Sequence, residues 1–194
     1  MIVVEHRKNS IAELKLVPPQ HGVEVDLRLS HGELILAHDP YARGENFTNW
    51  LQAYEHALLI LNVKEEGLEE VIMQQLHAYS VTNYFFLDQA LPSVVKSIKL
   101  KHSVAARISE YESNKWTAEF APTWVWADCF SGNWAYLDEE FEKLSKLKLK
   151  TCIVSPELQG RFDSEEMNNL MSILENHNFS PDAVCTKEAS KWIN

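Results

Sequence analysis

Short runs of apolar residues recur along the chain, and a longer stretch of mixed polar and apolar residues follows each of them. The runs are four to six residues long, which is typical of strands buried on both faces. The eight runs are Ile2–Glu5, Val23–Leu27, Leu58–Val63, Tyr84–Leu87, Val104–Ile108, Trp124–Ala127, Thr151–Val154 and Ala183–Thr186. Strands that alternate with helical patterns indicate βα units and a parallel sheet.

The stretches between the runs contain helical patterns. Residues 66–79, 134–148 and 164–177 each place apolar side chains three or four positions apart, which predicts amphipathic helices. Ser164 opens the last of them as a helix-capping residue would, and Pro92 stands where a further helix would begin.

Eight such units predict an α/β fold of the TIM type, a compact (β/α)8 barrel in which residues 1–194 form a single domain. The chain is short for this fold, whose usual length is about 250 residues. A doubly wound open sheet is the structural alternative. Residues 27–38 depart from this alternation of strands and helices, because they contain a strand, a Ser-His-Gly turn and a second strand with alternating polarity. We therefore expect a hairpin after the second barrel strand.

Charge and composition narrow the classes of function. The chain has 18 basic and 28 acidic residues, a net charge of −10 and no strong basic cluster, which argues against nonspecific nucleic-acid binding. No apolar run approaches the ~18 residues that span a bilayer, so no membrane insertion is expected. The three cysteines form no CxxC pair and the N-terminus lacks the pattern of a secretion signal. We expect a cytoplasmic protein.

Polar residues stand at the ends of the apolar runs. In a TIM barrel the carboxyl ends of the strands form the active-site face, so this concentration of ionisable residues predicts a catalytic type of barrel mouth. The residues at these ends include His6, Arg7, Asp26, Asn62, Lys64, Asp88, Arg107, Asp128, Glu157, Thr186 and Lys187.

Two carboxylates lie close together in the second run. Glu24 and Asp26 are two positions apart, so they face the same side of the strand with Cα atoms about 7 Å apart. Their mutual repulsion requires a positive partner. A hard divalent cation such as Mg²⁺ or Ca²⁺ is one candidate, with Asn62 as a third oxygen ligand. The alternative positive partners are Arg7 and Lys64, which would form a salt-bridge cluster with the two carboxylates without a metal.

Two histidines also stand at strand ends. His6 and His38 together could perform general acid–base chemistry near neutral pH, whereas we expect the other histidines to be structural. Asp88 and Asp128 could orient a histidine or bind a sugar hydroxyl, and Arg107 could join Arg7 and Lys64 in binding phosphate. Trp124 and Trp126 either form an aromatic wall for a sugar or fill the barrel interior.

These motifs follow a known order. They resemble the glycerophosphodiester phosphodiesterase family, whose pattern is His-Arg-Gly, then Glu-x-Asp on the second strand, then an apolar run ending in His-Asp, then Glu-x-Lys on the third strand. The last segment, residues 181–186, looks like the family's final strand, Asp-x-Ile-x-Thr-Asp. The matching positions are His6 and Arg7 in the first motif, Glu24 and Asp26 in the second, His38 and Asp39 in the third, and Lys64 in the fourth.

The resemblance implies a TIM barrel that cleaves a small-molecule phosphodiester. It implies general acid–base roles for His6 and His38 and a divalent metal, Mg²⁺ or Ca²⁺, at Glu24, Asp26 and the position of Asn62. Phosphatidylinositol-specific phospholipase C shares part of this arrangement, and its bacterial forms can dispense with the metal. The chain also looks like a short bacterial subgroup that is associated with surface-polysaccharide genes.

The chain departs from the family pattern at three places. Lys8 replaces the glycine of the first motif, and Asn62 replaces a glutamate, which removes one negative charge from the metal site. Residues 40–61 are too few for the insertion that caps the glycerol site of the family. We therefore expect a diester of another polyol or of a sugar, in a more exposed site.

Two other functions remain as alternatives. One is a barrel that has lost catalysis and binds a phosphorylated sugar or a partner in surface-polysaccharide metabolism. The other is a TIM-barrel isomerase or aldolase, in which Lys64 or Lys187 would form a Schiff base.

Overall fold

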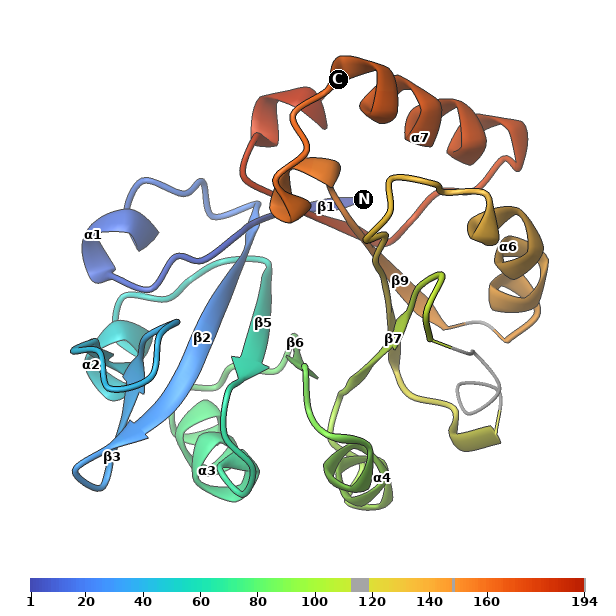
Figure 1. Cartoon of the computed structure of the whole chain (residues 1–194). Coiled ribbons are helices and arrows are strands. Elements are labelled where there is room, and N and C mark those ends of the chain that lie inside the picture. The colour runs from blue at the N-terminus through green and yellow to red at the C-terminus, as the bar shows by residue number, and fades with distance from the viewer. Residues whose placement is uncertain (113–118, 148, 194) are drawn as a thin grey trace.

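Eight parallel strands form the centre of the molecule, and the helices lie outside them (Figure 1). The computed structural model describes residues 1–112, 119–147 and 149–193. The parallel strands are β1 (Ile2–Glu5), β2 (Gly22–Ser30), β5 (Leu58–Val63), β6 (Tyr84–Leu87), β7 (Ala105–Ile108), β8 (Trp124–Ala127), β9 (Lys150–Val154) and β10 (Ala183–Thr186). Each of the eight predicted runs is therefore a strand, and the predicted TIM-type α/β fold is confirmed.

The strands pair in chain order around a barrel. β1 pairs in parallel with β2 and with β10, so the first and last strands are neighbours. β2, β5 and β6 continue on one side, and β7, β8, β9 and β10 on the other. The junction between β6 and β7 is a single parallel bridge from Phe86 to Val104, where the Phe86 amide donates to the Ser103 carbonyl at 2.9 Å.

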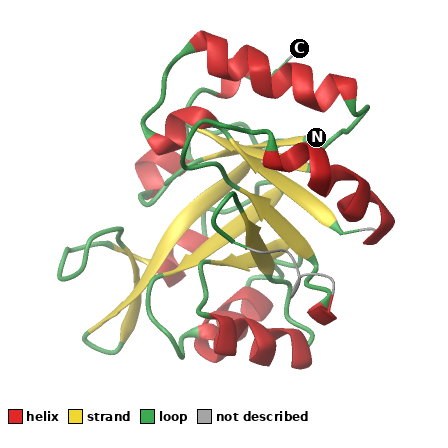
Figure 2. Cartoon of the chain, turned by 45° about the vertical axis from the view of Figure 1, so that its right-hand side comes forward, coloured by secondary structure: helices red, strands yellow, loops and turns green. Residues whose placement is uncertain are grey.

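The predicted hairpin is present beyond the barrel. The second half of β2 pairs antiparallel with β3 (Glu33–Leu36), which in turn pairs with β4 (Glu45–Asn46). Figure 2 shows the long strand β2 carrying this hairpin away from the rest of the molecule. The amino end of β2 has no room for a side chain, because a Cβ atom at Gly22 would lie 2.8 Å from the Leu58 carbonyl oxygen of β5.

The helices cover the outer face of the strands. Within the described residues these are α1 (Ile11–Leu14), α2 (Phe47–Leu51), α3 (Glu69–Ala78), α4 (Leu91–Lys99), α6 (Tyr136–Leu147) and α7 (Ser164–Asn176), with the short 3-10 turns η1 (Pro156–Gln159) and η2 (Ala189–Lys191). Predicted helix ends differ by a few residues. α3 begins three residues later than predicted because Gly67 adopts a left-handed turn with φ of +89°. The predicted end of α6 at Lys148 lies outside the described residues.

Alternation along the strands separates two apolar layers. Val23, Val25 and Leu27 of β2 pack outward in the layer beneath the helices, so Glu24 and Asp26 face the barrel interior. Trp124 and Trp126 face inward as well, are 3% and 4% exposed, and pack with the apolar side chains that fill the barrel. They are therefore interior packing residues. Within the described residues, no helix is long and apolar enough to cross a membrane.

Candidate active site

The carboxyl ends of β1, β2 and β5 bring the first group of predicted residues together. The pairing of β2 with β5 places Asp26 directly opposite Asn62, and Lys64 follows β5. The loop after β1 returns to β2, because the Lys8 amide donates to the Glu24 carbonyl at 2.9 Å. His6 and Arg7 are thereby held against the two carboxylates.

Asp26 is neutralised by cations of the chain itself. Its carboxylate is 1% exposed and lies 3.0 Å from Nζ of Lys64 and 3.4 Å from Nε of Arg7. Asn9 supports it twice, since its Nδ2 donates to Asp26 Oδ2 at 2.8 Å and its Oδ1 accepts the Asp26 amide at 2.9 Å. Of the positive partners expected from the sequence, Arg7 and Lys64 are in place around this carboxylate.

Glu24 lies in a different environment. Its Oε2 accepts the backbone amide of Arg7 at 2.8 Å and lies 3.7 Å from Nε2 of His6. Burial, reinforced by the nearby charge of Asp26, raises the pKa of Glu24 above its ordinary value. Arg7 donates this bond from a left-handed conformation with φ of +56°, which is uncommon for a residue with a side chain.

The oxygens around Glu24 fit a hard cation. Glu24 Oε1 and Asn62 Oδ1 are both buried and accept no hydrogen bond. Buried acceptors without donors are costly unless a cation or water satisfies them, and carboxylate and amide oxygens suit Mg²⁺ or Ca²⁺. The carboxylate of Asp26, the third expected ligand, already accepts a hydrogen bond from Asn9 and pairs with two cations. No cluster of three or more histidine, cysteine, aspartate or glutamate residues with metal-site geometry occurs within the described part of the chain.

The two predicted histidines differ in exposure. The His6 side chain is 14% exposed. Burial, together with the charges of Arg7 and Lys187, lowers the pKa of His6 to about 4. His38 follows β3 and is 42% exposed, and its Nδ1 lies 2.7 Å from Oδ1 of Asp39. That hydrogen bond and the charge of His38 lower the pKa of Asp39.

The hairpin holds His38 at the rim of the same group. The amide of Ala37 donates to the Asp26 carbonyl at 3.0 Å, and the Arg28 side chain donates to the His38 carbonyl at 2.9 Å. Among the contacts of the described residues, none joins the imidazole rings of His38 and His6.

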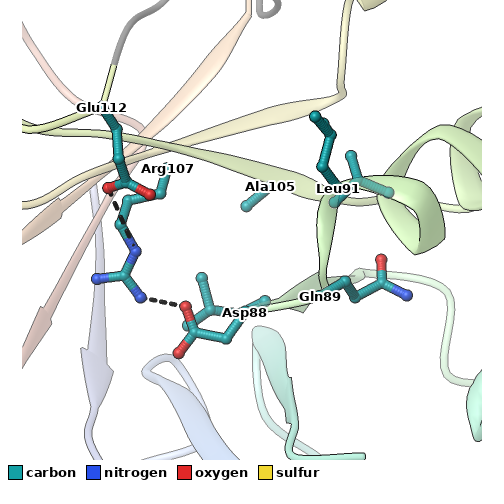
Figure 3. Close-up of a pocket in the computed structure, with 8 residues that line it drawn as sticks. Asp88, Gln89, Leu91, Ala105, Arg107 and Glu112 are labelled. Carbon is teal, nitrogen blue, oxygen red and sulfur yellow. Dashed lines mark hydrogen bonds and ion pairs between the residues drawn. The ribbon is translucent and has the colours of Figure 1, made fainter. Parts of the chain in front are cut away.

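The remaining predicted residues form a second group. Arg107 of β7 makes an ion pair with Asp88, and its Nε lies 3.8 Å from Glu112 (Figure 3). It makes a further ion pair with Asp128. Asp128 also accepts hydrogen bonds from Gln159 at 2.8 Å and from the Cys129 amide at 2.9 Å. The charge of Arg107, expected to bind phosphate, is therefore balanced by carboxylates, and the second group is acidic as a whole.

A cavity of about 380 Å³ lies beside this second group. Figure 3 shows Asp88, Arg107 and Glu112 on one side of it and Leu91 and Ala105 on another. A wall with both acceptors and apolar carbons suits a sugar or another polyol. A smaller cavity of about 160 Å³, lined by both Lys64 and Asp88, lies between the two groups.

Three further residues of the site were not predicted in these roles. Asn9 supports Asp26 from a loop, and Gln159 supports Asp128 from η1. Glu157 is 1% exposed and accepts the hydroxyls of Ser155 and Thr186 and the Lys187 amide, the last at 2.9 Å. The sequence marks Glu157 only as a polar residue near a strand end, and it carries no signal for Asn9 or Gln159.

Replacing Glu157 with glutamine is expected to destabilise the fold by about 2 kcal/mol at pH 7, because hydrogen bonds to a charged acceptor are lost. These hydrogen bonds lower the pKa of Glu157 despite its burial. The carboxylate therefore contributes stability above its unfolded pKa, and this contribution is lost as the pH falls through the lower folded value. Urea unfolding should show a difference between wild type and Glu157→Gln that shrinks below about pH 4.5. A difference that does not change with pH would contradict an ionised Glu157.

Solved structures of known proteins share this fold. No protein-family model and no curated protein sequence matches the chain. A glycerophosphodiester phosphodiesterase from Thermotoga maritima superposes with a TM-score of 0.71 at 16% identity, over 98% of this chain and 96% of that one. The corresponding protein from Parabacteroides distasonis gives 0.69 at 13% identity, over 100% and 87%. That from Agrobacterium tumefaciens gives 0.65 at 12% identity, over 97% and 96%.

These similarities extend over most of the length of both chains in each comparison. Identities of this size establish the shared fold. The chemistry depends on the residues of the site, because one barrel fold supports many reactions.

Proposed function

We propose that this chain is a phosphodiester hydrolase of the glycerophosphodiester phosphodiesterase type. The observation that carries the proposal is the buried pair Glu24 and Asp26, held beside His6, Arg7 and Lys64 at the carboxyl ends of the barrel strands. The motifs of the sequence and the shared fold support the same conclusion.

Arg7 and Lys64 would stabilise the negative charge of the phosphate. Both side chains form an ion pair with Asp26, which fixes their position. Their other N–H groups remain available to donate hydrogen bonds to the phosphate. Preformed cations that do not reorganise during the reaction stabilise a transition state efficiently. The phosphate of the substrate would therefore bind over the ends of β1, β2 and β5.

Glu24, Asn62 and one oxygen of Asp26 would hold the divalent metal, Mg²⁺ or Ca²⁺. When bound, such an ion polarises a phosphoryl oxygen and neutralises its charge. The unpartnered oxygens of Glu24 and Asn62 support this assignment.

His6 and His38 would exchange protons with the attacking and leaving oxygens of the diester. Asp39 binds Nδ1 of His38, which orients the ring and leaves Nε2 to exchange the proton. The alcohol part of the diester would extend toward Asp88 and Glu112, whose cavity suits a polyol or sugar.

A panel of activated and natural phosphodiesters tests the proposal. Turnover should be measured with Mg²⁺, Ca²⁺, Mn²⁺ or a chelator, beside a His6→Ala/His38→Ala double variant. Turnover that the double variant lacks would establish the reaction, and the chelator arm would establish whether a metal takes part. Turnover that persists in the double variant would contradict the roles of the histidines.

Binding of a phosphorylated sugar or a partner without turnover is the second candidate. It is favoured by the neutralisation of Asp26 by Arg7 and Lys64, which stabilises the pair without a metal. Binding of a sugar phosphate, with no hydrolysis of any diester, would support it.

Replacing Asn62 with glutamate is expected to tighten binding of Mg²⁺ or Ca²⁺ by about tenfold, because it adds a carboxylate beside Glu24. The measurement is the rise in melting temperature with metal concentration, which requires no turnover. Asn62→Gln keeps the amide but lengthens the side chain, and it serves as the uncharged control. Equal or weaker binding in Asn62→Glu would show that residue 62 is not a ligand.

A further inference from the structure

Lys187 lies beside His6 at the mouth of the barrel. β1 and β10 pair in register, with Glu5 opposite Thr186, and the His6 amide donates to the Thr186 carbonyl at 2.9 Å. Cys185 faces the barrel interior, and Lys187 is the first residue after the end of β10, in the bend that follows the strand. The charge of Lys187 is also among the causes that lower the pKa of His6.

The backbone at Lys187 is fixed although its side chain is exposed. Its amide donates to the buried Glu157, and the next amide, that of Glu188, donates to Thr186 Oγ1 at 2.9 Å. The indole of Trp192 donates to Ser155 Oγ at 3.0 Å and closes the same network. The backbone at this position therefore needs no further ordering when the side chain binds a ligand.

Lys187 also differs from the other cations of the barrel mouth in its partners. Lys64 and Arg7 contact Asp26, and Arg107 lies between two aspartates. In the part of the chain that the structure describes, Lys187 has no ion-pair partner.

The cations around His6 favour an anionic ligand on this side of the mouth. Arg7 and Lys64 pair with the carboxylate of Asp26, and the charge of Lys187 acts on the neighbouring His6, so three cations lie on this side of the mouth in a chain whose net charge is −10. A phosphodiester carries a single negative charge. Among the ion pairs of the described residues, Asp88, Glu112 and Asp128 share the single cation Arg107, so this side of the mouth favours the phosphate less than the side of Lys187.

We propose that Lys187 binds a non-bridging oxygen of the substrate phosphate. This inference rests on the proposed function, and it places the phosphate between the ends of β10 and β2, with the alcohol directed toward β6 and β7. Lys187 then acts as a residue that binds substrate rather than as a proton carrier.

Inorganic phosphate is the probe, because its binding can be measured without turnover. In isothermal titration calorimetry, Lys187→Met is expected to weaken phosphate binding about tenfold, the size expected for one charge-assisted hydrogen bond. Lys187→Arg should retain most of the affinity. Lys191→Met is the matched control, since Lys191 is also exposed, lies in the same segment and pairs with Glu188.

The outcomes separate this inference from the proposed function. Weaker binding in Lys187→Met alone supports the role of Lys187, whether or not the protein hydrolyses any diester. If diesters are hydrolysed, the same variant should raise KM more than it lowers kcat. Phosphate binding that is unchanged in Lys187→Met, or equally weakened in Lys191→Met, overturns the inference even if hydrolysis is observed. Absence of phosphate binding by the wild-type protein overturns it as well.

Discussion

Replacing His38 with alanine is expected to lower kcat for diester hydrolysis by ~10²–10⁴-fold, the usual contribution of a general acid or base. The His38 side chain is 42% exposed and bonds only to Asp39 among the side chains that the structure describes. Its removal should therefore change the free energy of unfolding by less than about 0.5 kcal/mol. The two measurements together separate a chemical role from a structural one.

His31 provides the control for this variant. It lies at the turn of the same hairpin, is exposed, and contacts Ser30 rather than the barrel mouth. His31→Ala should leave kcat unchanged, whereas His6→Ala should reproduce the loss. A His38→Ala protein that retains the wild-type rate would remove His38 from the proposed proton transfers.

Replacing Arg107 with methionine is expected to destabilise the fold by about 3 kcal/mol, because it leaves the carboxylate of Asp128 buried and without its cation. Asp128 is 2% exposed at its side chain, and the guanidinium is the only positive group that contacts it among the described residues. The effect would be measured by urea unfolding at pH 7. The double variant Arg107→Met/Asp128→Asn should recover part of the loss, because the buried charge is then removed.

Lys143→Met is the comparison for a pair on the surface. Lys143 is 55% exposed and pairs with Glu140 at 3.1 Å, so its loss should cost less than about 1 kcal/mol. If Arg107→Met were no more destabilising than Lys143→Met, the second group would be an adaptable surface cluster rather than a fixed wall of the cavity.

The strands of this barrel could be predicted because each is buried on both faces and stands out as an apolar run. Helix boundaries were less certain, since Gly67 delays the start of α3 by forming a turn that the helical pattern does not indicate. Trp134 fits the helical pattern as well, yet it precedes α6 and donates its indole N–H to Glu166 at 3.0 Å. Contacts of this kind join distant segments and leave no local pattern.

The residue types at the barrel mouth could also be predicted, because parallel strands end on the same face. The ion pairs that these residues form with one another could not be predicted. The sequence permits Asp26 to bind a metal or the cations Arg7 and Lys64, and only the cross-strand geometry places those cations against it. Arg107 was expected to bind phosphate, but β6 and β8 bring Asp88 and Asp128 to it.

The thin junction between β6 and β7 has a consequence for the range of substrates. One bridge joins these strands, and the cavity that contains Asp88 and Arg107 opens at the same place. Separating two strands there disrupts few backbone hydrogen bonds, whereas the opposite side of the barrel, at β10, β1 and β2, is continuously paired. The barrel thus joins a continuously paired half, where the proposed phosphate site lies, to a half with fewer strand-to-strand hydrogen bonds, which can widen more easily. For the proposed hydrolysis, we expect alcohols of different sizes to be accepted while the diester linkage stays in one position.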